Sequence, residues 1–139
     1  MTSDSLVLNR QYVKDLSFEN PKAPFVFLNE EKKEIDLSID ISANEIEQNV
    51  HEVVLSISAK AVKSKEIFFL ADLKYACVCT VKTTSDLKKL LFVHCPHIIF
   101  PYARKIISDA VLEGGFPNFF IAPIDFESLY HQNKEKTEN

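Results

Sequence analysis

The segment His94-Cys95-Pro96-His97 is the part of this sequence whose residue types could best perform chemistry. Two imidazoles beside a thiol could bind a metal ion, or Cys95 could act as a nucleophile with His97 as its base. Adjacent side chains point in different directions, however, and no further Cys/His pair follows at the spacing of metal ligands. We therefore expect a structural role and no metal site, and keep a small Cys95/His97 enzyme as an alternative.

Two other cysteines, Cys77 and Cys79, are separated by one residue in an apolar stretch. In a strand they share one face and fill the core as small hydrophobic side chains. A redox pair would normally have the spacing Cys-x-x-Cys, so we expect a structural role here too. An odd total of three cysteines argues against a disulfide framework and fits a reducing compartment.

Composition indicates one domain and excludes several kinds of site. A chain of 139 residues that is 46% hydrophobic can bury one core, so we expect a single domain over 1–139 with a polar, frayed tail at 131–139. The only glycines are Gly114 and Gly115, so glycine-rich phosphate loops are absent from the sequence. No cofactor is expected.

Charge and hydropathy indicate the compartment and the class of partner. Residues 1–52 carry eleven acidic and five basic side chains, which disfavours nucleic acid and favours a basic protein surface. A merely solvated acidic surface is the alternative. The first residues lack a signal-peptide pattern, and the longest apolar run, Ile67 to Ala71, is too short to span a bilayer. We therefore expect a cytoplasmic protein without membrane insertion.

Alternating apolar and polar residues predict four strands, at 6–18, 34–41, 52–62 and 67–82. Each has one apolar face, as in an antiparallel sheet covered on one side. In the first strand, Tyr12 is expected inward and Gln11 outward. By the same parity the outward face carries a set of carboxylates: Asp15, Glu19, Asp36, Asp40 and Asp72.

The C-terminal third predicts two helices that cover the sheet. Phe100 precedes a proline and is disfavoured in a helix, so the first helix should begin at Pro101 and end at Gly114 or Gly115. Asp125 is the expected N-cap of the second helix. The predicted fold is thus α+β, a four-stranded antiparallel sheet with two C-terminal helices on one face.

The apolar arc of the first helix is wider than one sheet face needs. It includes Tyr102, Ala103, Ile106 and Ala110. We therefore expect these residues to contact a second copy of the chain.

Two ordered sequence blocks resemble the SecB family of export chaperones. One runs from His94 to Tyr130 and contains HCPHIIFPYAR, GGFP and APIDFESLY; the other is Tyr12 to Pro21. The resemblance implies a homotetramer, a dimer of dimers, with the long helices between two layers and the His94–His97 segment in a helix-entry turn. Where the family often has a tryptophan, after the first strand, this chain aligns Glu31.

The resemblance also implies a function. SecB-like proteins are ATP-independent holdases that keep unfolded precursor proteins competent for translocation and deliver them to the SecA motor. Such a protein has no active site. A SecB-like chaperone for another client, such as an antitoxin, is the alternative within this class.

Two surfaces would carry that function. Aromatic residues in the connection 21–31 and around 119–121 predict either a groove for extended clients or plain packing; the candidates are Phe25, Phe27, Phe119, Phe120, Phe126 and Tyr130. Asp15, Glu19 and Asp72 match positions where SecB-like proteins place acidic residues for SecA docking, and Leu70 shares their outward face. A flat acidic surface of this kind suits a small, basic, zinc-bound segment of the motor.

Overall fold

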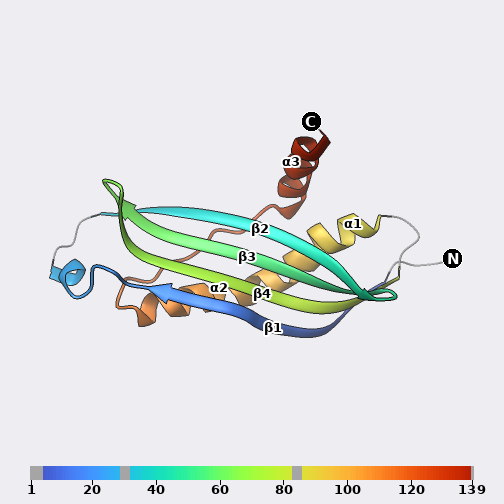
Figure 1. Cartoon of the computed structure of the whole chain (residues 1–139), viewed down its shortest axis with the longest axis horizontal. Helices are drawn as coiled ribbons and strands as arrows, with labels where there is room; N and C mark the ends of the chain where they lie inside the picture. Colours follow the sequence, from blue (N-terminus) through green and yellow to red (C-terminus); the bar gives the residue numbers. More distant parts are fainter. Residues whose placement is uncertain (1–4, 29–31, 83–85, 139) are drawn as a thin grey trace.

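A computed structural model describes residues 5–28, 32–82 and 86–138 and contains one four-stranded antiparallel sheet (Figure 1). Glu31 lies outside the described residues. The strands are β1 (Ser5–Glu19), β2 (Glu34–Glu47), β3 (Val50–Lys63) and β4 (Glu66–Lys82), in the spatial order β1-β4-β3-β2. The predicted antiparallel sheet is therefore confirmed, with β3 and β4 at its centre.

The two central strands keep the alternation that their sequences predict. Every second residue from Val53 to Ala61 in β3, and from Phe69 to Val81 in β4, is buried on the inner face. The hairpin between these strands turns at Ser64 and Lys65, both of which have positive φ, so this tight turn forms without glycine. The chain can therefore build long hairpins although it has only two glycines.

Strand β1 departs from the predicted facing because it contains two irregularities. Its register against β4 shifts at Asn9 and again at Lys14. Each extra residue reverses the alternation of the side chains that follow. Tyr12 therefore lies on the outer face, and Gln11 lies inward, where its Oε1 accepts a hydrogen bond from the Tyr75 hydroxyl at 3.3 Å. The expected facing of Tyr12 and Gln11 is wrong, whereas the second shift restores the predicted facing after Lys14.

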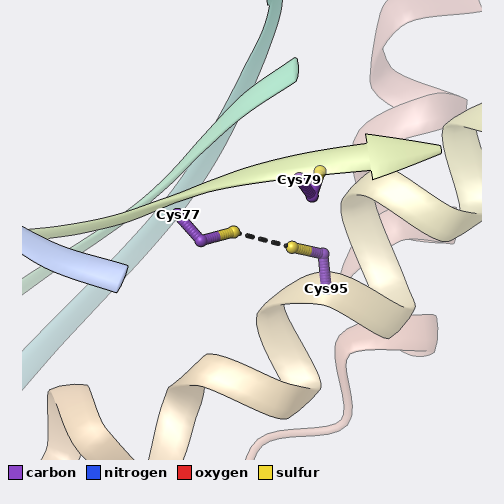
Figure 2. Close-up of side chains that lie close together, drawn as sticks. All are labelled: Cys77, Cys79 and Cys95. Carbon is purple, nitrogen blue, oxygen red and sulfur yellow. Dashed lines mark hydrogen bonds between the residues drawn. The ribbon is translucent and has the colours of Figure 1, made fainter. Parts of the chain in front are cut away.

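One long helical stretch packs against the inner face of the sheet (Figure 1). It consists of α1 (Leu87–Lys89), a single π-helical turn η2 (Leu90–His94) and α2 (Cys95–Glu113), in direct succession. The predicted start at Pro101 is wrong, and Cys95 lies within the helical stretch, with its side chain toward β4 (Figure 2), rather than in an entry turn.

The proline is tolerated because tertiary packing outweighs local preference. A proline inside a helix costs about 3 kcal/mol, but helical geometry buries Ile99 and Phe100, each contributing roughly 1.5–3 kcal/mol. Pro101 itself is exposed. At its other end, α2 closes as predicted: Gly114 is the C-cap and Gly115 has φ +89.

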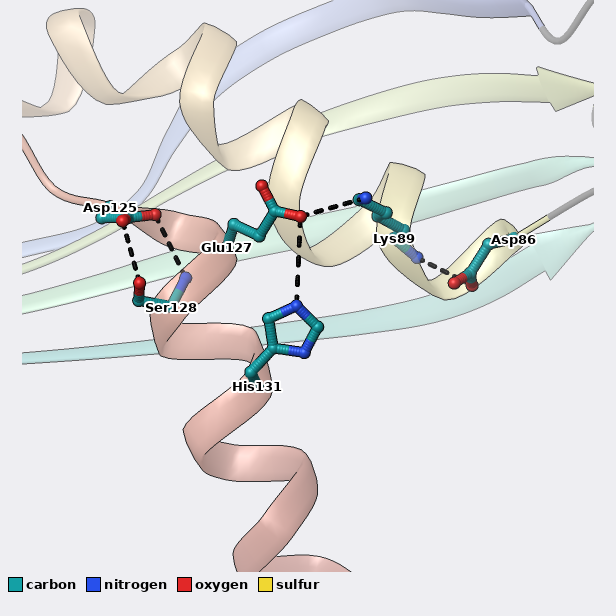
Figure 3. Close-up of polar contacts among 6 residues, drawn as sticks. All are labelled: Asp86, Lys89, Asp125, Glu127, Ser128 and His131. Atoms are coloured by element: carbon teal, nitrogen blue, oxygen red, sulfur yellow. Dashed lines mark hydrogen bonds and ion pairs between the residues drawn. The ribbon is translucent and has the colours of Figure 1, made fainter.

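The second helix, α3 (Phe126–Glu138), begins where Asp125 was predicted to cap it. The Asp125 carboxylate accepts hydrogen bonds from the Ser128 backbone N–H at 3.1 Å and the Ser128 hydroxyl at 2.8 Å (Figure 3). The helix continues to Glu138, and fraying of the polar tail stays a prediction.

Helix α3 packs on the first turns of the long helix and projects away from the sheet (Figure 1). Glu127 forms an ion pair with Lys89, whose Nζ lies 3.0 Å from Glu127 Oε1, and His131 Nε2 lies 3.9 Å from the same oxygen (Figure 3). Of the two predicted helices, α2 is thus the one that covers the sheet. No helix within the described ranges is both long and apolar enough to cross a membrane.

Candidate functional site

The outer face of the sheet is hollowed into a shallow, acidic depression that spans all four strands. Its volume is about 320 Å³. It is lined by Asp15, Ser17, Ser38, Asp40, Ser56, Ile57, Ser58, Asp72, Leu73 and Lys74. Three carboxylates and one ammonium give this depression a net charge of −2. The expected flat surface is therefore concave, and small serine side chains leave room in it.

The four predicted docking residues lie on this same outer face. Asp15 is opposite Lys74 in the register of β1 with β4, and Glu19 is opposite Leu70. Asp72 lines the depression with Asp15, whereas Glu19 and Leu70 lie two residues farther along the same strands, β1 and β4, beyond its lining. Leu70 is half-buried, so it offers a modest apolar area beside the carboxylates.

Farther along the same face, Tyr12 and Lys14 of β1 bind Glu52 of β3. The Lys14 ammonium lies 2.7 Å from Glu52 Oε1, and the Tyr12 hydroxyl donates to Glu52 Oε2. The hydrogen bond from Lys14 is the main cause that lowers the pKa of Glu52, and the hydrogen bond from Tyr12 contributes as well. Burial is the main cause that raises the pKa of Tyr12 to about 12, and the hydrogen bond to Glu52 adds to it. This network could not be read from the sequence, because it requires the shifted register of β1.

At the C-terminal end of α2, four phenylalanines form an aromatic cluster. Phe116 lies 4.8 Å from Phe69 and 5.5 Å from Phe27, and Phe18 lies 5.8 Å from Phe69, measured between ring centroids. Phe25 lies two residues before Phe27 in the short helix η1 (Phe25–Leu28), and its side chain is 74% exposed. Of the groove candidates, Phe27 is therefore partly covered and Phe25 is open.

The other groove candidates lie near the long helix farther toward its N-terminus. Phe126 is only 3% exposed and packs edge-on against Phe100 at 5.8 Å, so it belongs to the core. Tyr130 stacks on Phe92 at 6.1 Å. Helical geometry puts roughly 22 Å between Phe100 and Gly115, so the six candidates follow a path along the helix and do not form one pocket.

The linker between α2 and α3 runs along that path and carries Phe119 and Phe120. Phe120 is 65% exposed, and the Arg104 guanidinium lies 4.5 Å from the centre of its ring. The Phe119 carbonyl accepts a hydrogen bond from the Ser108 hydroxyl at 2.7 Å, which fixes the linker against α2. Phe25, Phe27 and Phe120 are consequently the candidates that present aromatic surface to a partner.

The predicted oligomer contact divides between the inside and the outside of the chain. Ala103 is fully buried against the sheet, whereas Tyr102 is 54% exposed, and Ile106 and Ala110 are half-buried. Two further apolar residues of α2, Ile98 and Leu112, are 43% and 54% exposed. Ile98, Tyr102, Ile106 and Ala110 follow one another at i, i+4 spacing, so they form an outward apolar stripe on α2. Leu112, two residues after Ala110, points to another side of the helix.

All three cysteines meet between β4 and the start of α2 (Figure 2). Their sulfur atoms lie within 4.8 Å of one another, and the Sγ atoms of Cys77 and Cys95 are 3.0 Å apart. The pKa of Cys79 is lowered, mainly by the hydrogen bond from Cys77 and next by that from Cys95. The pKa of Cys77 is raised to about 12, mainly by its hydrogen bond to Cys79. This cluster was missed because the helix was expected to start after Cys95.

The proposed catalytic pair does not assemble around Cys95. Its side chain is fully buried and points toward Cys77 (Figure 2), whereas His97 is exposed on the helix. A nucleophile and its base must come within hydrogen-bond reach of each other. The geometry therefore does not support the Cys95/His97 enzyme.

Comparison with known proteins gives consistent matches over almost the whole chain. The family "Preprotein translocase subunit SecB" matches residues 1–137. A protein-export protein SecB from Legionella pneumophila is 39% identical over 132 residues, covering 94% of this chain and 82% of the relative. One from Rhodopseudomonas palustris is 41% identical over 131 residues, covering 92% of this chain and 83% of the relative.

A solved structure with a similar fold is that of a SecB-like chaperone from Mycobacterium tuberculosis in complex with a ChAD peptide from the HigA1 antitoxin. The TM-score is 0.71 at 12% sequence identity, with 86% of this chain and 90% of that chain covered. At this identity, the similarity concerns the fold.

Proposed function

Because the chain belongs to the SecB family of protein-export chaperones, we propose that it holds unfolded precursor proteins without ATP and delivers them to the SecA motor. The observation that carries this proposal is the exposed aromatic surface along α2. Phe25 and Phe120 are 74% and 65% exposed, so both rings leave large aromatic surfaces open to solvent.

An unfolded client would bind along the path that these residues mark. An extended segment of about seven residues covers the roughly 22 Å between Phe100 and Gly115. Aromatic faces tolerate many side-chain shapes, so the path can accept clients of different sequence. Each patch contributes weakly, and a long client that engages several patches, on one copy or on several, is held by their combined effect.

Assembly as a homotetramer, a dimer of dimers, is the second part of the proposal. The outward stripe of α2 supports it, because one exposed or half-exposed apolar side chain in each of four successive helical turns favours burial against another copy. Tyr102, Ile106 and Ala110 would lie in the contact, and Ala103 would support it from within the protomer. Bringing several copies together would also multiply the client patches.

Delivery to SecA is the third part, and the acidic depression supports it. Asp15 and Asp72 line this depression, and Glu19 and Leu70 lie next to it on the same face. Carboxylates on a concave face would steer a small, basic partner segment, and Leu70 would add a little apolar contact. Client and motor would then use different surfaces of the chain, so both could bind at once.

A cytoplasmic location without a catalytic role completes the proposal. Cys77, Cys79 and Cys95 are free thiols, which a reducing compartment preserves. The export task also requires contact with precursors before they cross the membrane.

The proposal is tested by diluting a denatured precursor protein into buffer with and without the chaperone, in the absence of nucleotide, and following light scattering. We expect the purified chain to suppress aggregation at near-stoichiometric amounts, and Phe25→Ala with Phe120→Ala to weaken this effect. Val7→Ala with Ile46→Ala, two exposed apolar side chains on β1 and β2, is the matched control. Unchanged aggregation with the folded wild-type chain would contradict the proposal.

A further inference from the structure

The three cysteines form the densest group of metal-ligand atoms in the part of the chain that the structure describes. Cys77 and Cys79 project from the inner face of β4, and Cys95 begins α2, so the three sulfurs come from two elements (Figure 2). All three side chains are fully buried. Sulfurs around a tetrahedral zinc ion are roughly 3.8 Å apart at a Zn–S bond of about 2.3 Å, so sulfurs within 4.8 Å of one another need only small side-chain adjustments.

A second and independent observation comes from His51. It is the buried polar residue of the inner face, 6% exposed, and its Nδ1 is buried without a hydrogen-bond partner. His51 lies directly opposite Cys79 in the register of β3 with β4. Residues opposite each other in adjacent strands have Cβ atoms roughly 5 Å apart on the same face. The His51 side chain is therefore a neighbour of Cys79 on the inner face. Its nitrogens do not lie within 4.8 Å of all three sulfurs, so the imidazole would have to rotate toward the cluster to become a ligand.

The other nitrogen of this imidazole already has an acidic neighbour. His51 Nε2 lies 3.8 Å from Glu45 Oε2, across the β2–β3 pair. Metal-binding histidines generally donate their remaining N–H to a carboxylate or carbonyl, which orients the ring and makes the other nitrogen a better ligand. Glu45 is placed for that role, and Nδ1 is the nitrogen left for a metal.

From this arrangement we propose that Cys77, Cys79, Cys95 and His51 bind one zinc ion between the sheet and the long helix. Three thiolates and one imidazole are an established ligand set for structural zinc. Charge favours zinc over Cu(I), the other soft ion that thiolates select. Three thiolates leave a net charge of −1 around Zn²⁺ but −2 around Cu⁺, and a buried charge is costly.

Binding converts thiols to thiolates, so the protons of the three cysteines leave to solvent as the Zn–S bonds form, and no electron is transferred. The ion would join β4, β3 and the start of α2, next to the π-helical turn at Leu90–His94. It would thus fix the end of the helical stretch on which α3 packs. Removing the ion should loosen this end first, while the opposite end, near Gly114, keeps its own contacts.

The experiment uses the full chain, freed of metal by a chelator under reducing conditions. One equivalent of Co²⁺ should produce sulfur-to-metal charge transfer and the intense visible bands of a tetrahedral site, and Zn²⁺ should remove them. Elemental analysis after dialysis should find about one zinc ion per chain, and zinc should raise the thermal midpoint relative to chelator. These measurements need no variant, so misfolding of a mutant cannot obscure them.

Variants then identify the ligands. Cys95→Ser and Cys77→Ser should abolish the charge-transfer bands, and His51→Ala should weaken zinc binding at least about tenfold, the effect expected even for an orienting neighbour. Glu45→Gln should weaken it by about tenfold. His94→Ala, next to Cys95 but exposed, is the matched control and should leave the spectrum unchanged.

Three results would overturn the proposal. The wild type could retain no zinc and show only the weak colour of hydrated Co²⁺. It could bind Cu(I) with three sulfurs but not zinc, which would exclude His51 as fourth ligand. Finally, mass spectrometry could show that Cys77 and Cys95 remain joined in a disulfide after treatment with a reductant, which would remove two of the ligands.

Discussion

Reversing the charges of Asp15 and Asp72 tests the docking face most sharply, because both line the acidic depression. An ion pair at 4 Å in water is worth about 1 kcal/mol, and screening at physiological salt reduces this to roughly 0.6 kcal/mol. Changing Asp to Lys replaces attraction by repulsion, which doubles the change. Two reversals should therefore cost roughly 2.4 kcal/mol, or about a 50-fold rise in the Kd for SecA.

The assay is a binding titration of purified SecA against wild type and Asp15→Lys/Asp72→Lys. Wild-type affinity should fall as salt approaches 1 M, where the Debye length is about 3 Å, and the reversed protein should respond little or in the opposite sense. Glu47→Lys/Glu66→Lys makes the same charge change near the two hairpin turns and serves as the control. Client holding should persist in both variants.

Two results would refute this reasoning. The reversed protein could bind SecA as tightly as wild type, which would place the docking face elsewhere. Alternatively, the control could weaken binding as much as the reversal does, which would mean that total charge matters and the depression does not.

The remaining predictions concern the core, the assembly and the response to pH. Phe126→Ala should lower the free energy of unfolding, measured by denaturant titration, by roughly 3–5 kcal/mol, because Phe126 is only 3% exposed. Phe120→Ala, at an exposed residue, should leave the free energy of unfolding nearly unchanged. Equal losses in the two variants would contradict the assignment of Phe126 to the core and of Phe120 to the client path. Ala110→Asp should split the tetramer in sedimentation experiments by placing an unpaired charge in the outward stripe, while Asp109→Ala, at an exposed neighbour, should not; a wild-type monomer would sink the assembly proposal. Glu52 has a folded-state pKa below its ordinary value of 4.5, chiefly through Lys14, so its stabilising effect is present above about pH 4.5 and is lost as the pH falls toward the lower folded value. Glu52→Gln should accordingly show a weaker loss of stability on acidification than wild type, and identical acid profiles would contradict the assignment.

Periodicity predicted the centre of the sheet well, because every second residue of β3 and β4 is buried on the inner face, with only Val54 and Ala76 buried on the other face of these two strands in the same stretch. The outward placement of Asp72 followed from the same alternation, whereas that of Asp15 holds because the two register shifts of β1 cancel each other. In β1, the shifts at Asn9 and Lys14 could not be foreseen, since a single asparagine and a lysine inside a strand pattern do not specify a bulge. The Tyr12–Glu52 contact was lost with them.

The helix start shows how tertiary packing can override a local rule. A residue before proline is disfavoured in a helix, yet Phe100 is helical because its burial against Phe126 stabilises that conformation. Starting the helix too late also hid the cysteine cluster, because Cys95 reaches Cys77 only from a helix that already lies on β4. The concavity of the outer face was equally out of reach, since it depends on how the whole sheet curves.

The proposed holdase function depends on recognition of unfolded proteins, and one binding measurement tests this directly. A fluorescently labelled precursor is titrated with the chaperone, without nucleotide, once while it is kept unfolded and once after it has folded. We predict saturable binding of the unfolded form, weakened by Phe25→Ala with Phe120→Ala, and no measurable binding of the folded form. The proposed function would be contradicted if the chaperone bound the unfolded and folded precursor equally well. It would also be contradicted if the correctly folded chaperone bound neither form.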